Sequence, residues 1–137
     1  DLNAMREISN KLSIPLIYDA APGMGVKVRG KSLLEHGDCS VVSFHATKIF
    51  TTFEGGAIIS KTKSQKEKID RIKNFGIESG SKVTNYGING KMSEFNAALG
   101  ILQLKYIDQI IGMRKKVYDT YKNLIKGNAH CRLKKKE

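Results

Sequence analysis

The sequence is poor in residues that stiffen or crosslink a chain. It has no tryptophan, only two prolines, and two cysteines, Cys39 and Cys131, that stand far apart. Neither cysteine has a neighbour at metal-ligand spacing, so we expect no metal site, no disulfide framework and a reducing compartment. Apolar runs of the roughly 20 residues that a membrane span needs are also lacking. We therefore expect no membrane span, no secretion leader and a cytoplasmic location.

Positive charge is abundant, with a formal net charge of +11 over 137 residues. The basic residues concentrate in 61–73, in 114–116 and in the tail 132–136. The first two segments also carry apolar residues at helical spacing, so solvated helix faces explain their charge. Nucleic-acid binding would favour aromatic residues among the basic ones, and the tail has none. We expect no nucleic-acid partner, and an unstructured basic tail over 127–137.

The first half of the chain predicts a helix followed by strands that end in polar residues. Apolar residues recur at helical spacing over 1–12, and Pro15 ends that pattern. A short buried strand over 16–18 then leads to Asp19. The next apolar, β-branched stretch starts at Val41 and runs into Ser43, His45, Thr47 and Lys48. Ligands of open α/β sheets lie at the carboxyl ends of strands, so these side chains stand where a site would be built.

Lys48 has two possible roles by the residues alone. Partial burial lowers the pKa of a lysine toward the neutral amine that attacks carbonyls, which makes Lys48 a Schiff-base candidate. In that case Ser43 and Thr47 are possible phosphate donors. A lysine that merely extends to solvent from a strand end is the alternative.

One motif in this half resembles a nucleotide-binding loop. Residues 25–32 match the pattern G-x-x-x-x-G-K-S letter for letter. A phosphate loop must open a long helix, whereas here Gly37 and Asp38 interrupt the pattern after barely one turn. The interior 26–29 alternates like an edge strand instead. We therefore do not expect a phosphate loop, and nucleotide binding through it is the least favoured function.

The second half predicts one more strand and several helices. A strand is expected over 57–60, and a helix that begins with a capping box at Ser64 and closes at Gly76. Residues 77–91 are polar and glycine-bearing, which predicts a long loop with a functional or interface role. From Ser93 onward, two helices joined near Asp108 or Gly112 are expected. Their apolar residues predict core packing: Phe95, Leu99, Leu102, Tyr106, Ile110, Met113, Val117, Tyr121 and Leu124.

Four segments in order carry a family resemblance. They are Asp19-Ala20-Ala21, the stretch 43–48, Glu54-Gly55-Gly56-Ala57 and the stretch 89–100. Together they resemble the DegT/StrS family of sugar aminotransferases, pyridoxal-phosphate enzymes of the aspartate-aminotransferase fold (fold type I). The likeness covers 1–126, and it implies an α/β fold in which this segment is the central part of the large cofactor-binding domain. That domain has a mostly parallel sheet flanked by helices.

The resemblance also implies roles for individual residues. Lys48 matches the lysine that binds pyridoxal 5'-phosphate and moves the substrate proton, and Asp19 matches the acid at the ring nitrogen. Ser43 matches the phosphate-binding serine, and Ala21 belongs to the same cofactor-binding motif as Asp19. Asn89 matches an asparagine that reaches the phosphate in a neighbouring subunit, which implies a homodimer with shared active sites. Substrate-binding roles are expected for His45 and Lys91.

The family's reaction moves an amino group, usually from glutamate, to a nucleotide-linked keto sugar for surface polysaccharides or antibiotics. Two positions depart from the family: Pro22 replaces a His or Gln, and Lys91 replaces an arginine. Lysine lacks the bidentate fork of arginine, so both changes bear on substrate choice. Family members are several hundred residues long, so this chain is expected to be a fragment. A catalytically silent fragment or assembly module is therefore the alternative function. Sugar dehydratases of the same fold usually carry His in place of Lys48.

Overall fold

The computed structural model describes residues 1–128 and Cys131. Its first element is α1 (Leu2–Leu12), which confirms the helix expected over 1–12. The Asp1 carboxylate caps this helix, because its Oδ1 accepts hydrogen bonds from the amides of Asn3 (2.9 Å) and Ala4 (3.3 Å). The helix ends at Ser13, whose φ of 53° places it in the left-handed region. Most of the predicted tail 127–137 lies outside the described residues.

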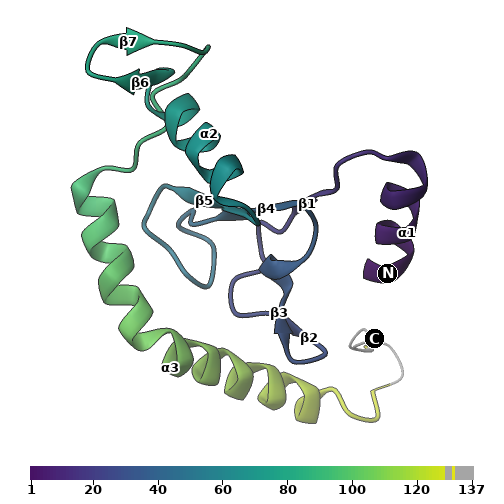
Figure 1. Ribbon diagram of the computed structural model, residues 1–137. Coiled ribbons are helices and arrows are strands. Elements are labelled where there is room, and N and C mark those ends of the chain that lie inside the picture. Colours follow the sequence, from purple (N-terminus) through teal and green to yellow (C-terminus); the bar gives the residue numbers. More distant parts are fainter. Residues whose placement is uncertain (129–130, 132–137) are drawn as a thin grey trace.

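A small mixed sheet lies at the centre of the molecule (Figure 1). Its strand order is β1 (Ile17–Asp19), β4 (Cys39–Ser43) and β5 (Gly56–Ser60). β1 and β4 are parallel, whereas β4 and β5 are antiparallel. The described residues therefore do not show the mostly parallel sheet that was expected. The connection over 44–55 contains no helix that could cross the face of the sheet, and it returns the chain antiparallel to β4.

The segment that resembles a phosphate loop is a β-hairpin. β2 (Lys27–Val28) pairs antiparallel with β3 (Lys31–Ser32), and the turn between them has positive φ at Arg29 (50°) and Gly30 (83°). Two successive positive φ values are typical of the tight turn that joins hairpin strands. Only the 3-10 turn η1 (Leu33–Glu35) follows. This geometry confirms that the segment is not a phosphate loop.

Helix α2 (Lys63–Lys73) covers one face of β5, and its start differs from the prediction. Thr62, not Ser64, is the capping residue: its hydroxyl accepts a hydrogen bond from the Gln65 amide at 3.2 Å. The Gln65 side chain in turn accepts from the Thr62 amide at 3.2 Å. Thr62 and Gln65 have the three-residue spacing that a capping box needs, so the prediction was wrong by two residues.

The region 77–91, predicted to be loop, contains a second hairpin. β6 (Ile77–Ser79) pairs antiparallel with β7 (Lys82–Val83), with a register irregularity between Ile77 and Ser79. This hairpin extends beyond the end of α2 (Figure 1). Its strands are short and largely exposed, so they lack the buried apolar alternation that would have predicted them.

The last element is one continuous helix, α3 (Glu94–Leu124), so the prediction of two helices was wrong. The Ser93 hydroxyl caps it by accepting a hydrogen bond from the Asn96 amide at 3.2 Å. A glycine inside a helix costs only about 1 kcal/mol, so Gly112 does not interrupt it. Figure 1 shows that α3 bends as it passes the sheet. No helix among the described residues has the length and apolar character needed to cross a membrane.

The core is small and is centred on β4 and the loop that follows. Its buried apolar residues are Leu16, Ala20, Val42 and Phe50. The α3 stripe was predicted to pack in a core, but most of it is exposed in the described part of the chain. Leu99 and Ile110 are half-buried, and the exposed fractions of the other residues of the stripe range from 50% for Leu102 to 90% for Phe95. This prediction was wrong for the chain described, because α3 meets the rest of the molecule over only a small part of its surface.

Candidate active site

The parallel pairing of β1 with β4 brings the first predicted site residues together. Asp19 lies opposite Val41, and the Ala20 amide donates to the Val41 carbonyl at 2.9 Å. One residue further, the Ser43 amide donates to the Ala21 carbonyl at 3.3 Å. Asp19, Ala21 and Ser43 therefore lie at the carboxyl ends of adjacent parallel strands, where α/β sheets bind ligands.

Asp19 is held at this edge by a local hydrogen bond. Its Oδ1 accepts from the Ala21 amide at 3.0 Å, which is the geometry of an Asx turn. The carboxylate is exposed. An acidic group at this place can hold a proton on a basic nitrogen of a bound molecule.

Lys48 lies in a tight turn that begins at the end of β4. Its amide donates to the His45 carbonyl at 2.9 Å, and the Ser43 hydroxyl accepts from the His45 amide at 3.3 Å. The His45 ring accepts from the Thr47 amide at 3.2 Å. Lys48 is half-buried, and it follows Ser43 within one turn. Ser43, Lys48 and Asp19 thus belong to segments that end at the same edge of the sheet.

The loop after Lys48 is fixed by residues to which the sequence assigned no role. Phe50 contacts Phe44 edge to face, with ring centroids 4.7 Å apart. Thr52, 1% exposed, donates its hydroxyl proton to the Glu54 carbonyl at 2.8 Å. The Asn96 side chain of α3 donates to the same carbonyl at 2.8 Å. Glu54 and Asn96 belong to segments that carry the family resemblance, which was the available signal for them.

The other predicted residues are attached to the end of α2. Asn89 forms an antiparallel bridge with Asn74. The Lys91 ammonium donates to the Asn74 side chain at 3.2 Å and lies 4.4 Å from the centre of the Phe75 ring. The structure thus places Asn89 and Lys91 beside α2, and not in the hydrogen-bonded group formed by Asp19, Ala21, Ser43, His45 and Lys48.

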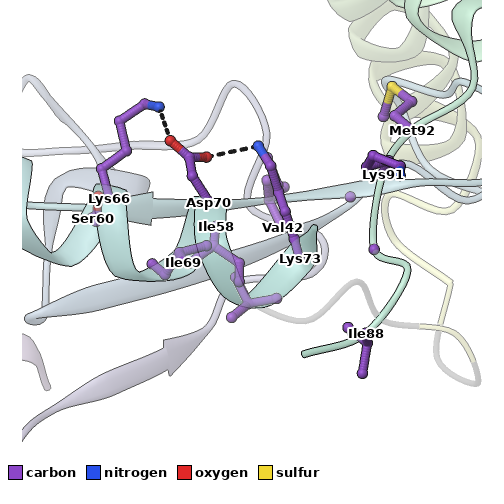
Figure 2. Close-up of a pocket in the computed structure, with 14 residues that line it drawn as sticks. Val42, Ile58, Ser60, Lys66, Ile69, Asp70, Lys73, Ile88, Lys91 and Met92 are labelled. Atoms are coloured by element: carbon purple, nitrogen blue, oxygen red, sulfur yellow. Dashed lines mark hydrogen bonds and ion pairs between the residues drawn. The ribbon is translucent and has the colours of Figure 1, made fainter. Parts of the chain in front are cut away.

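A groove of about 720 Å³ lies between α2 and the sheet (Figure 2). Its floor is formed by apolar residues of β4 and β5, and Met92 lies at one end. On α2, Asp70 forms ion pairs with Lys66 and with Lys73, the latter at 2.7 Å. Hydrogen bonds from Lys66 and then Lys73 lower the pKa of Asp70 to about 2. Of the predicted site residues in the described ranges, Lys91 alone lines this groove.

Comparison with known proteins gives consistent matches. The family model of the DegT/DnrJ/EryC1/StrS aminotransferases matches residues 1–137. The chain is 48% identical over 126 residues to a dTDP-4-amino-4,6-dideoxy-D-glucose transaminase of Shigella dysenteriae. That match covers 92% of this chain and 34% of the relative. The chain thus spans about a third of the length of the curated relatives it matches.

Solved structures show the same α/β arrangement. A putative PLP-dependent aminotransferase from Bacillus cereus superposes with a TM-score of 0.88 at 35% identity, over 100% of this chain and 38% of that one. Helicobacter pylori PseC, an aminotransferase involved in the biosynthesis of pseudoaminic acid, also gives 0.88 at 27% identity. That match covers 94% of this chain and 36% of PseC. The chain therefore belongs to the DegT/DnrJ/EryC1/StrS aminotransferase family.

Proposed function

We propose that these residues form the central part of a PLP-dependent aminotransferase that acts on a nucleotide-linked keto sugar. The observation that carries this proposal is the β1–β4 register, which aligns Asp19 with the strand that leads to Ser43 and Lys48. Family membership and relatives named for nucleotide-sugar amination support it.

The donor set at this edge fits pyridoxal 5'-phosphate in chemical type. Lys48 supplies an amine for the cofactor aldehyde, Asp19 a carboxylate for the ring nitrogen, and Ser43 a hydroxyl for the phosphate. Ala21, whose backbone joins the two strands, would border the ring. When bound, the cofactor supplies an electron sink for the carbanion left by proton removal. Lys48 would take and return that proton, and Asp19 would keep the ring nitrogen protonated.

The substrate half of the proposal rests on the relatives' names and on charge. We propose that Lys91 attracts the diphosphate of the nucleotide, that His45 lies toward the sugar, and that glutamate is the amino donor. Asn89, attached to α2 and away from Lys48, would contact the phosphate bound by a second subunit. The active enzyme would then be a homodimer, acting in the cytoplasm in amino-sugar and surface-polysaccharide synthesis.

Reduction with borohydride tests the cofactor site directly. The full-length protein is incubated with pyridoxal phosphate and reduced, and the labelled peptide is mapped by mass spectrometry. We expect the label on Lys48, loss of label in Lys48→Ala, and normal labelling in the control Lys27→Ala, where an exposed hairpin lysine is removed. Specific labelling of a different lysine would contradict the assignment.

The substrate class is tested by comparing acceptors. Amino transfer from glutamate to a dTDP-linked keto sugar is expected, with at least a tenfold lower kcat/KM for the same sugar without its nucleotide, since about 1.4 kcal/mol of lost binding already gives that factor. Lys91→Met should lower kcat/KM for the nucleotide-linked sugar only. Equal rates with both acceptors would exclude a nucleotide-linked substrate.

A second candidate is a catalytically silent assembly module, favoured by the exposed apolar residues of α3. An exposed apolar face of this kind is typical of a surface that packs against another segment or chain. Measurable amino transfer by the 137-residue chain alone would exclude this candidate.

A further inference from the structure

Three hydrogen bonds around Lys48 converge on one residue, His45. Its amide donates to the Ser43 hydroxyl at 3.3 Å, and its carbonyl accepts from the Lys48 amide at 2.9 Å. Its ring nitrogen Nδ1 accepts from the Thr47 amide at 3.2 Å. His45 therefore connects the end of β4 to the residue that the proposed function makes catalytic.

The bond from Thr47 determines which ring nitrogen of His45 carries the proton. An amide N–H can be accepted only by a nitrogen with a free lone pair, so Nδ1 is unprotonated and Nε2 holds the proton in the neutral ring. The Thr47 hydroxyl, 3.0 Å from Nδ1, can donate to the same lone pair. A side-chain acceptor that takes the amide two residues ahead closes the same kind of turn as the Asx turn formed by Asp19.

The other ring nitrogen makes a weaker contact. Nε2 lies 3.7 Å from the Glu54 carboxylate, and the two side chains are 47% and 77% exposed. Contacts between groups this exposed contribute little to stability. Glu54 is held chiefly through its backbone carbonyl, by Thr52 and Asn96. Of the two contacts of the His45 ring, the local bond at Nδ1 is thus the one that stabilises the turn.

We infer that His45 is a positioning residue: its Nδ1 holds the Thr47 amide inside the turn 45–48, which the Lys48–His45 backbone bond closes, and thereby fixes the direction from which Lys48 leaves the sheet. This role is separate from the position toward the sugar that the proposed function gives the ring. The inference rests on the proposed function only for what Lys48 does, because the geometry of the turn stands without it. The ring needs only an acceptor at Nδ1, so an amide oxygen at that place should replace it.

Two conservative variants in the full-length protein separate the two ring nitrogens. In His45→Asn the side-chain oxygen occupies the place of Nδ1, whereas in His45→Gln it reaches toward the place of Nε2. Amide hydrogen exchange at Thr47 and Lys48 should be within about twofold of the wild type in His45→Asn. It should be about fivefold faster in His45→Gln and in His45→Phe, because one net hydrogen bond is lost. The control Glu54→Gln should also stay within about twofold.

A second readout follows Lys48 itself. Pyridoxal phosphate and borohydride should label Lys48 at similar rates in the wild type and in His45→Asn. Labelling should be slower in His45→Gln and in His45→Phe. Exchange and labelling that are alike in the Asn and Gln variants would overturn the inference. So would faster exchange in Glu54→Gln equal to that in His45→Gln. If the wild-type label maps to another lysine while the exchange pattern holds, the proposed function fails and the positioning role of His45 stands.

Discussion

Asp38 joins three segments at the amino-terminal edge of the sheet. Its carboxylate accepts a hydrogen bond from the Leu16 amide at 2.8 Å and from the Arg6 guanidinium at 3.0 and 3.2 Å. The Leu16 bond, and then Arg6, hold the pKa of Asp38 below its ordinary value of 3.8. This one side chain therefore attaches α1 and the start of β1 to the start of β4.

We predict that Asp38→Asn makes the chain's stability less sensitive to acid. Because the folded-state pKa is lowered, the ionised carboxylate stabilises the fold above about pH 4. That contribution disappears as the pH falls through the lowered pKa. Urea unfolding at pH 7 and pH 3 should show a smaller fall for Asp38→Asn than for the wild type. The control Asp108→Asn, at an exposed position on α3, should fall as much as the wild type does.

The motif residues were predictable from the sequence one by one, whereas their supports were not. Polar residues after β-branched runs marked Asp19, Ser43 and Lys48 because strand ends have a local signature. The bond between Asn96 and Glu54 joins residues 42 positions apart, and no local pattern encodes it. Whether these residues bind a cofactor stays a prediction.

Among the elements, α2 shows how a cap decides where a helix begins. Thr62 and Gln65 exchange side-chain and backbone hydrogen bonds, and Gln65 also accepts from the Lys61 amide at 3.2 Å. Ser64 lies inside the first turn, where its hydroxyl is not needed as the cap. Thr62 and Ser64 are both exposed, so the effects of substituting them can be compared without a contribution from packing.

We predict that Thr62→Ala lowers the free energy of unfolding by about 1 kcal/mol, since a cap hydrogen bond is lost. The control Ser64→Ala should change it by less than about 0.5 kcal/mol, because alanine is favoured within a helix. Equilibrium urea unfolding measures both. A larger loss for Ser64→Ala would show that the helix begins at the site first predicted.

Whether a segment is a helix or a strand was more predictable than how the strands pair. Apolar spacing and Pro15 predicted the helix over 1–12 and strands over 16–18, from Val41 and over 57–60. The structure has these strands at 17–19, 39–43 and 56–60. The antiparallel direction of β5 and the hairpin β6–β7 depend on loop geometry that composition does not encode. Continuity of α3 through Gly112 was missed because a single glycine is a weak interruption.

At the scale of the whole molecule, α3 touches the rest of the chain at a few places. Asn96 holds the Glu54 carbonyl, and Gly100 lies so near Thr52 that a Cβ there would come within 3.0 Å of its methyl group. Further along, the Ile111 side chain lies over Gly25, where an added Cβ would be 2.9 Å from Cδ1. Between and beyond these contacts, many apolar side chains of α3 face solvent.

We predict that substitutions at two apolar residues of α3 differ in their effect on stability. Ile111→Ala should lower the free energy of unfolding of this chain by about 1–2 kcal/mol, because a half-buried contact is lost. Val117→Ser, at a position 57% exposed, should change it by less than about 0.5 kcal/mol. A loss for Val117→Ser as large as that for Ile111→Ala would mean that the exposed face is covered in solution.

The β1–β4–β5 pairing has a consequence for the order in which the protein forms during synthesis. Within the part of the chain that the structure describes, every strand of the β1–β4–β5 sheet, and the turn that carries Lys48, lies between residues 17 and 60. During synthesis these residues leave the ribosome before α3 does, whereas a domain generally folds as one unit. Until α3 is present, the Glu54 carbonyl lacks its hydrogen bond from Asn96, and Thr52 lacks its contact with Gly100. The loop that follows Lys48 therefore reaches its final packing only when α3 has been added.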